Sequence, residues 1–146
     1  MKISCIGIVH YSDGVVLVRD DPKAQWRLPQ RELDDSEDVV LCIRRCVLMQ
    51  TGYKISKLRL YKIQTIPRTP KRGAALKFIF GCEIGDTPIQ TPDIEAQKFG
   101  PDDVVKLAVQ EKFSDVMLLD IINKYDALAA PPKAHEWHTH PITSLQ

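Results

Sequence analysis

The sequence predicts a single α+β domain. Strand-like segments occur near the start and in the middle of the chain, and they flank one amphipathic helix, with further helix-forming residues near the end. With 146 residues, 27% charged and 44% hydrophobic, the chain is large enough to bury its own core. We therefore expect a domain over residues 1–128, followed by a flexible Pro- and His-containing tail over residues 129–146.

The first segment has the pattern of a β-hairpin. Residues 3–10 form a near-continuous run of Ile, Cys and Val, which indicates a strand buried on both faces. Residues 11–14 provide turn chemistry, with Gly14 able to adopt positive φ. Residues 15–19 predict the second strand, and the Asp-Asp-Pro sequence that follows ends it.

The best helix signal covers apolar residues that recur with helical spacing from Val39 to Val47. Residues 26–28 before it predict a brief strand, and residues 30–35 predict a polar acidic loop. Either Ser36 or Asp35 is expected to cap the helix, and the acidic residues after them complement its dipole. Thr51 and Gly52 supply the expected stop at its other end.

The second half of the chain predicts two strands and two helices. Strand-like residues occur at 58–63 and 74–84, with a basic hairpin loop at 68–73 between them. Residues 102–107 predict a short helix. Residues 112–124 predict a longer one with an apolar inner face.

Charge and cysteine content narrow the possible classes of protein. The formal net charge of +1 excludes a broad electrostatic field directed at nucleic acid or an anionic membrane, but it leaves room for local basic patches. The apolar run near the N-terminus is too short for a signal sequence or a membrane span. The four cysteines lie in apolar segments without C-x-x-C spacing, which predicts buried free thiols in a cytoplasmic protein; they are Cys5, Cys42, Cys46 and Cys82.

Residues 26–53 resemble the Nudix box. That family is marked by a Trp-x-Leu-Pro lead-in and then G-x5-E-x7-R-E-U-x-E-E-x-G-U, where U is bulky and aliphatic. Anchoring the motif on Gly52 aligns it without a gap, and the matching positions are Trp26, Leu28, Pro29, Glu37, Arg45, Val47 and Gly52. The resemblance covers residues 2–124 and implies a Nudix-like α/β/α sandwich with a mixed β-sheet between helices.

The departures from the motif concern its metal ligands. The resemblance implies hydrolysis of a nucleoside diphosphate linked to another moiety, with Mg²⁺ or Mn²⁺ held by glutamates. Cys46, Met49 and Gln50 stand where three of those glutamates belong. Mg²⁺ prefers hard, anionic oxygen ligands, which a thiol, a thioether and an amide do not provide. We therefore expect no metal at the usual site, impaired or absent hydrolysis, and a helix face absorbed into the core or left as an apolar pocket floor.

Three functions follow from this pattern. The first is a Nudix-like protein that binds a nucleoside diphosphate derivative with little or no hydrolysis, in a sensor, regulatory or interaction role that requires no cofactor. The second is a hydrolase with a weakened or relocated Mg²⁺ or Mn²⁺ site, for which Glu37 and Glu95 are the candidate catalytic residues. The third is a scaffold that contacts protein or RNA, with Leu41 and Leu48 as a possible homodimer contact. Ligand identity, oligomeric state and pathway are not indicated.

The candidate substrate-binding residues are Gln30, Arg31, Arg45, Gln50, Arg68 and Arg72. Arg31 replaces the opening glycine of the motif, where it either supplies fixed positive charge for a diphosphate or points to solvent. The basic loop either contacts the phosphate of a ligand or of RNA, or is simply solvated. A direct ion pair between Glu37 and Arg45 is not expected, because two helical turns separate them by about 12 Å.

Two other groups permit metal binding but also have simpler explanations. Cys42 and Cys46 stand one helical turn apart and could hold a soft metal with Cys5 or a histidine, but small buried residues of a helix–sheet core are the better explanation. In the tail, three histidines within residues 135–140 either chelate a transition metal or belong to a segment without a fixed site.

Overall fold

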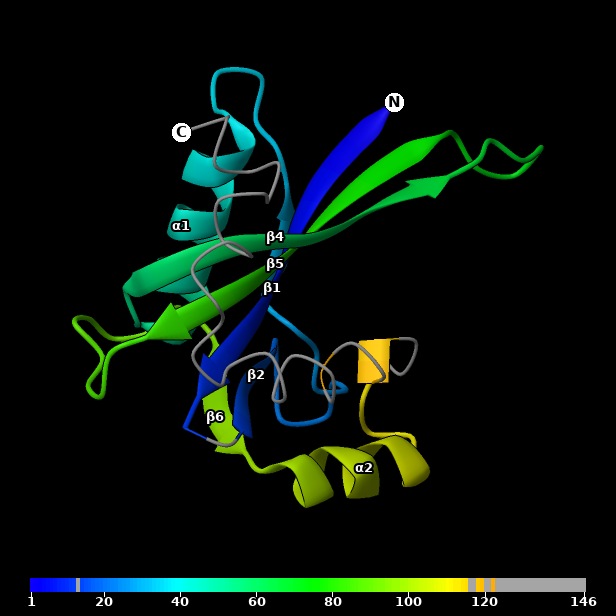
Figure 1. Ribbon diagram of the computed structural model, residues 1–146. Coiled ribbons are helices and arrows are strands. Elements are labelled where there is room, and N and C mark those ends of the chain that lie inside the picture. The colour runs from blue at the N-terminus through cyan, green and yellow to red at the C-terminus, as the bar shows by residue number, and fades with distance from the viewer. Residues whose placement is uncertain (13, 116–117, 120–121, 123–146) are drawn as a thin grey trace, which may run out of the picture.

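The computed structural model describes residues 1–12, 14–115, 118, 119 and 122 (Figure 1). Its elements, in chain order, are β1 (Lys2–Tyr11), β2 (Gly14–Arg19), β3 (Gln30–Glu32), α1 (Val39–Thr51), β4 (Ile55–Ile66), β5 (Ala75–Ile84), β6 (Glu95–Phe99) and α2 (Pro101–Val109). The strands form one sheet in the order β4-β5-β1-β2-β6, with β3 paired to β1. β1 and β5 are parallel and the other pairs are antiparallel, so the sheet is mixed.

Each face of the sheet carries its own hydrophobic cluster. Along β1, Cys5 and Val9 join the cluster beneath α1, whereas Ile6 and Ile8 join the cluster that includes Val104 of α2. Figure 1 shows α1 and α2 far apart, beside different parts of the sheet. The burial of β1 on both faces is confirmed, and so is the predicted α+β fold with a mixed sheet between helices.

The N-terminal hairpin is confirmed, and Gly14 is required at its turn for space. β1 and β2 pair in the register Val9 with Val16 and Tyr11 with Gly14. A Cβ atom on Gly14 would lie 2.2 Å from the carbonyl oxygen of Phe99, because β6 pairs closely with β2 at this point. Any larger residue there would push the edge strand away from the sheet.

α1 begins two residues later than predicted. Its N-cap is Asp38, whose carboxylate accepts the Leu41 N–H at 2.7 Å; the predicted caps Ser36 and Asp35 lie outside the helix. The prediction was wrong because Glu37 turns inward before the helix starts. At the other end Gly52 has φ of 80° and donates its N–H to the Leu48 carbonyl at 2.9 Å, so the predicted stop is confirmed.

Some predicted strands are displaced in the structure. Trp26 and Arg27 make only isolated bridges, and the regular strand β3 falls at Gln30–Glu32, in the predicted acidic loop. β6 was not predicted as a strand. Both short strands form by backbone pairing with segments that are distant in the sequence. A pattern of only three to five side chains is too short to predict such pairing.

The later helices agree in part with prediction. α2 spans Pro101–Val109 and includes the predicted residues 102–107. Residues 112–115 are not helical, so the predicted helix over 112–124 does not begin at residue 112. Most of its remainder, and the whole tail over residues 129–146, lies outside the described residues. Within the described part of the chain, each helix is too short or too polar to span a bilayer.

β4 and β5 form a long hairpin that extends beyond the body of the sheet (Figure 1). The predicted basic loop is its tip, closed by backbone hydrogen bonds between Thr69 and Arg72. β4 is also an edge strand of the sheet, whereas β5 lies between β4 and β1. We call this hairpin, residues 55–84, the β4–β5 arm.

The four cysteines are free and buried, as predicted. Cys5 of β1 and Cys42 of α1 place their Sγ atoms 2.9 Å apart in the cluster beneath the helix. A hydrogen bond with Cys46, together with burial, raises the pKa of the Cys5 thiol, and burial raises the pKa of Cys42. The thiols of Cys5 and Cys42 are therefore protonated core side chains rather than nucleophiles.

Candidate functional site

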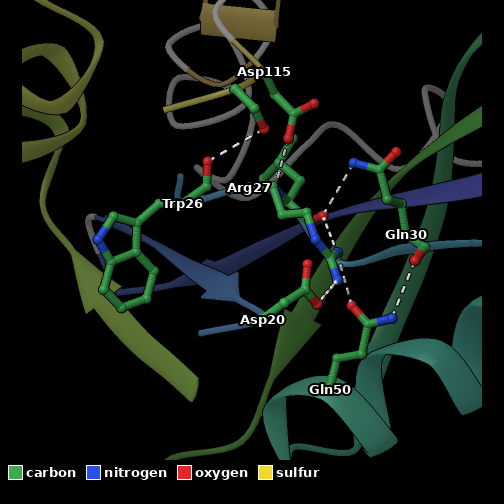
Figure 2. A network of polar contacts seen from close by, with 8 residues as sticks. Asp20, Trp26, Arg27, Gln30, Gln50 and Asp115 are labelled. Carbon is green, nitrogen blue, oxygen red and sulfur yellow. Dashed lines mark hydrogen bonds and ion pairs between the residues drawn. The ribbon is translucent and has the colours of Figure 1, made fainter. Parts of the chain in front are cut away.

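The C-terminal end of α1 is joined to Arg27 through Gln50. The Gln50 Oε1 atom accepts a hydrogen bond from Arg27 Nη1 at 3.2 Å, and its Nε2 donates to the Gln30 carbonyl at 3.1 Å (Figure 2). Both ends of the amide are thus engaged. Gln50 is the residue that the sequence aligns with the last glutamate of the box, and here it faces a guanidinium.

The Arg27 guanidinium is held by two further acceptors. Nη1 donates to the Leu28 carbonyl at 3.2 Å, and Nη2 pairs with Asp20 Oδ1 at 3.1 Å. The Arg27 side chain is only 20% exposed. Sequence reasoning assigned fixed positive charge near the box to Arg31 and missed Arg27. The available signal was the alternation of side chains in an extended segment. Trp26 and Leu28 are apolar and join the core on one face, so Arg27 between them points to the opposite face.

The N-terminal end of α1 has a buried carboxylate instead. Glu37 forms an ion pair with Arg31 and lies 3.7 Å, Oε2 to Nη1, from Arg45, with its own side chain only 2% exposed. The expectation that Glu37 and Arg45 do not pair was wrong, because Glu37 precedes the helix and turns back over its first turns. Among the described residues Oε2 accepts no hydrogen bond, so Arg45 neutralises it by charge alone.

Glu37 is ionised in this setting. Burial by itself would raise its pKa, but the backbone N–H of Asp34, at 3.2 Å from Oε1, and the Arg31 guanidinium outweigh burial and lower the pKa. Arg31 also pairs with Asp34 at 3.3 Å. The charge of Arg31 is therefore engaged within the protein, so the alternative that Arg31 points freely to solvent is wrong, and its role in phosphate binding stays a prediction.

The other residues aligned with the box differ in exposure. Cys46 is 1% exposed and belongs to the core beneath α1, whereas Met49 is 44% exposed. The expectation that this helix face is absorbed into the core therefore holds for Cys46 and is wrong for Met49. Glu95 begins β6 and pairs with Arg19, whose guanidinium carbon lies 4.3 Å from the centroid of the Trp26 ring. Over the described ranges, no group of three or more His, Cys, Asp and Glu side chains is placed to hold a metal ion.

A cleft of about 440 Å³ lies between the β4–β5 arm and the segment after α2. Its polar lining includes Gln64, Arg72, Lys77, Ser114 and Asp115. Of the two candidate arginines of the basic loop, the structure thus brings Arg72 to the cleft, and Arg68 is not part of its lining. Lys77 of β5 was not among the candidate binding residues predicted from the sequence.

Asp115 connects the cleft to the Arg27 network. Its Oδ2 accepts the Leu28 N–H at 2.8 Å, and the Leu28 carbonyl in turn accepts from Gln30 and Arg27 (Figure 2). Burial raises the pKa of Asp115, although the Leu28 N–H and the charges of Lys77 and Arg27 oppose the shift. Sequence reasoning missed Asp115. The only signal for it was that an acidic residue lies in a stretch with apolar residues such as Phe113 and Val116, which predict burial.

Comparisons with known proteins bear on the fold. No sequence profile of a known protein family matches the chain. The E3 ubiquitin-protein ligase LubX of Legionella pneumophila, in strains Paris and Philadelphia 1, is 30% identical over 79 residues, which is 54% of this chain. That match spans only about a third of the relatives' own length, 33% and 32% respectively.

Solved structures are similar over most of the chain. A Nudix hydrolase from Nitrosomonas europaea has a TM-score of 0.66 and 20% identity, with 86% of this chain and 88% of that chain covered. A MutT structure from work on Aliivibrio salmonicida and Vibrio cholerae has a TM-score of 0.64 and 9% identity, covering 83% and 94%. A MutT Nudix hydrolase from Burkholderia pseudomallei has a TM-score of 0.55 and 16% identity, covering 70% and 84%. At these identities the likeness concerns the architecture: the chain has the fold of the Nudix hydrolases.

Proposed function

We propose that this Nudix-fold protein binds a nucleoside diphosphate derivative with little or no hydrolysis and that it serves as a sensor or regulatory protein. The observation that carries the proposal is the contact between Arg27 and Gln50 at the end of α1. A guanidinium is a permanent cation with five N–H donors, and it suits bidentate recognition of phosphate. In this proposal Arg27 supplies the positive charge that a bound divalent ion supplies in a metal-dependent site.

The residues at the degenerate box do not suit Mg²⁺ or Mn²⁺. Cys46 is a buried thiol, Met49 is an exposed thioether, and both ends of the Gln50 amide are already hydrogen-bonded. Mg²⁺ is a hard cation that prefers anionic oxygens in octahedral geometry. A divalent ion placed next to Arg27 would also be repelled by the guanidinium charge.

The cleft has suitable size and chemistry for the rest of the ligand. Its volume of about 440 Å³ falls within the usual range for small-molecule sites. Arg72 and Lys77 provide positive charge for phosphate oxygens, and Gln64 and Asp115 provide hydrogen bonds for a base or sugar. Asp115 is fixed in this lining by the Leu28 N–H, which its Oδ2 atom accepts at 2.8 Å.

Calorimetric titration of the intact chain with ADP, UDP-glucose and diadenosine tetraphosphate tests this function. We expect at least one of these ligands to bind, with no cleavage product in the presence of Mg²⁺ or Mn²⁺. Arg27→Met should weaken that binding about tenfold, which corresponds to about 1.4 kcal/mol for lost charge-assisted hydrogen bonds. Lys23→Met, an exposed residue, is the matched control for loss of one positive charge and should leave the affinity unchanged.

Two results would contradict the proposal. Steady release of a mononucleotide with Mn²⁺ would show a working hydrolase with a relocated metal site. An absence of binding to every diphosphate, in protein shown to be folded by circular dichroism, would remove the nucleotide role altogether.

A further inference from the structure

Positive charge is strongly concentrated in one part of the molecule. Between residues 55 and 82 there is no Asp or Glu, and the basic residues of that stretch are Lys57, Arg59, Lys62, Arg68, Lys71, Arg72 and Lys77. The whole chain nevertheless has 20 Lys and Arg against 19 Asp and Glu. The net charge of the chain is therefore near zero because the basic residues of the arm are balanced by acidic residues in other parts of the sequence.

The strand register places three of these residues on a single face. Lys57, Arg59 and Lys62 are opposite Glu83, Gly81 and Ile79 of β5. Partners in an antiparallel pair share a face, and Ile79 belongs to the hydrophobic cluster on the α2 side of the sheet. β4 has two register shifts, and each inserts one extra residue without a partner, Ser56 or Tyr61. Because of these extra residues, Lys57, Arg59 and Lys62 all lie on the same face of the strand.

This row of lysine and arginine leads to the cleft. The next pair along the arm is Gln64 with Lys77, and both residues line the cleft together with Arg72. The ion pair between Lys57 and Glu83 is weak: Lys57 Nζ lies 4.0 Å from Glu83 Oε2 with its side chain 69% exposed, and an exposed pair of this kind contributes little. β4 is an edge strand, so no further strand of the described sheet covers its outer side.

We propose that this face of the β4–β5 arm binds the phosphate backbone of a single-stranded nucleic acid. Alternate residues of a strand are about 6.6 Å apart, a spacing similar to that of successive phosphates in an extended single strand. A single row of cations suits one flexible nucleic-acid strand. Such a strand can run along the row and place its terminal nucleotide in the cleft. Such binding draws on counterion release and is therefore strongly salt-dependent.

The same face does not suit a lipid surface. The arm has one large apolar residue that is classed as exposed, Ile63, and about half of it is accessible (48%). Its partner in the register is Phe78, which packs with the cluster on the α1 side, so Ile63 lies on the face opposite to the lysines. A basic face without exposed apolar side chains lacks the anchors that insert into a membrane.

Fluorescence anisotropy with labelled twelve-nucleotide oligouridylate and oligothymidylate tests the proposal, at KCl concentrations from 50 to 200 mM. We expect the double variant Lys57→Gln/Lys62→Gln to reduce the slope of log K against log salt by about 1.4, since each phosphate contact contributes about 0.7 for a single strand. Affinity at the lowest salt should fall at least several-fold. The control Lys23→Gln/Lys106→Gln removes the same charge from exposed positions outside the arm and should behave as wild type.

The outcomes separate this inference from the nucleotide role. Lys57, Arg59 and Lys62 do not line the cleft, so the double variant should retain its affinity for ADP. Oligonucleotide binding without ADP binding would support the arm and remove only the nucleotide role. The inference would be overturned by absent or salt-independent binding, by an equal loss in the control variant, or by polyglutamate competing as well as the oligonucleotide.

Discussion

At each end of α1 a polar side chain contacts arginine, but this side chain is charged at one end and neutral at the other. At the start of the helix, the buried carboxylate of Glu37 is held by Arg31 and Arg45. At the end, the neutral amide of Gln50 is held by Arg27. The acid is thus neutralised by two arginines, whereas the amide leaves the charge of Arg27 without a carboxylate from α1. This difference underlies our proposal that the Arg27 guanidinium takes the role that a divalent cation has in a metal-dependent site.

The largest effect should come from introducing an acid at Cys46, a buried position in the second half of α1. Cys46 is 1% exposed and packs among thiols and apolar side chains, so a carboxylate there would be removed from water. Cys46→Glu should therefore lower the free energy of unfolding by more than about 3 kcal/mol. The free energy of unfolding is measured by urea denaturation, with circular dichroism as the signal. A loss below about 1 kcal/mol would show that the end of the helix accommodates an acid as its start does.

An intermediate effect should follow from removing the acid at the start of the helix. Glu37→Gln leaves Arg31 and Arg45 without their buried carboxylate and should reduce stability at neutral pH. The folded-state pKa of Glu37 is lowered, since the Asp34 N–H and Arg31 outweigh burial, so its contribution is present above the ordinary glutamate pKa and is lost as pH falls through the lowered value.

The pH dependence of Tm provides the check on Glu37. The difference between wild type and Glu37→Gln should be greatest at neutral pH and should narrow as the solution becomes more acidic than the ordinary glutamate pKa. A constant difference down to strongly acid pH would mean that the carboxylate charge contributes nothing and that the arginines act elsewhere.

The smallest effect should come from the exposed position near the end of the helix. Met49 is 44% exposed, so Met49→Glu should change the free energy of unfolding by no more than about 0.5 kcal/mol. In the same urea experiment it serves as the matched control for Cys46→Glu, because it adds the same acid to the same helix. If both variants lost equal stability, burial would not be the cause.

Sequence patterns predicted the parts of this structure that depend on local periodicity. The N-terminal hairpin, the apolar face of α1 and the stop of this helix at Gly52 follow from apolar spacing and from one residue that tolerates positive φ. The strands β3 and β6 are short and form by pairing with distant segments, so local patterns did not reveal them. The contacts of Arg27 with Gln50, and of Asp115 with Leu28, join residues 23 and 87 positions apart. Only the folded chain brings such residues together.

The affinity for ADP with and without metal tests the central claim most directly. If the Arg27 guanidinium supplies the cation at the end of α1, calorimetry should give dissociation constants that agree within about twofold in excess Mg²⁺ and in EDTA, since a difference that small is about 0.4 kcal/mol. Binding that is lost in EDTA, or that Mg²⁺ strengthens more than tenfold, would show that a divalent ion supplies the charge for binding and would contradict the account.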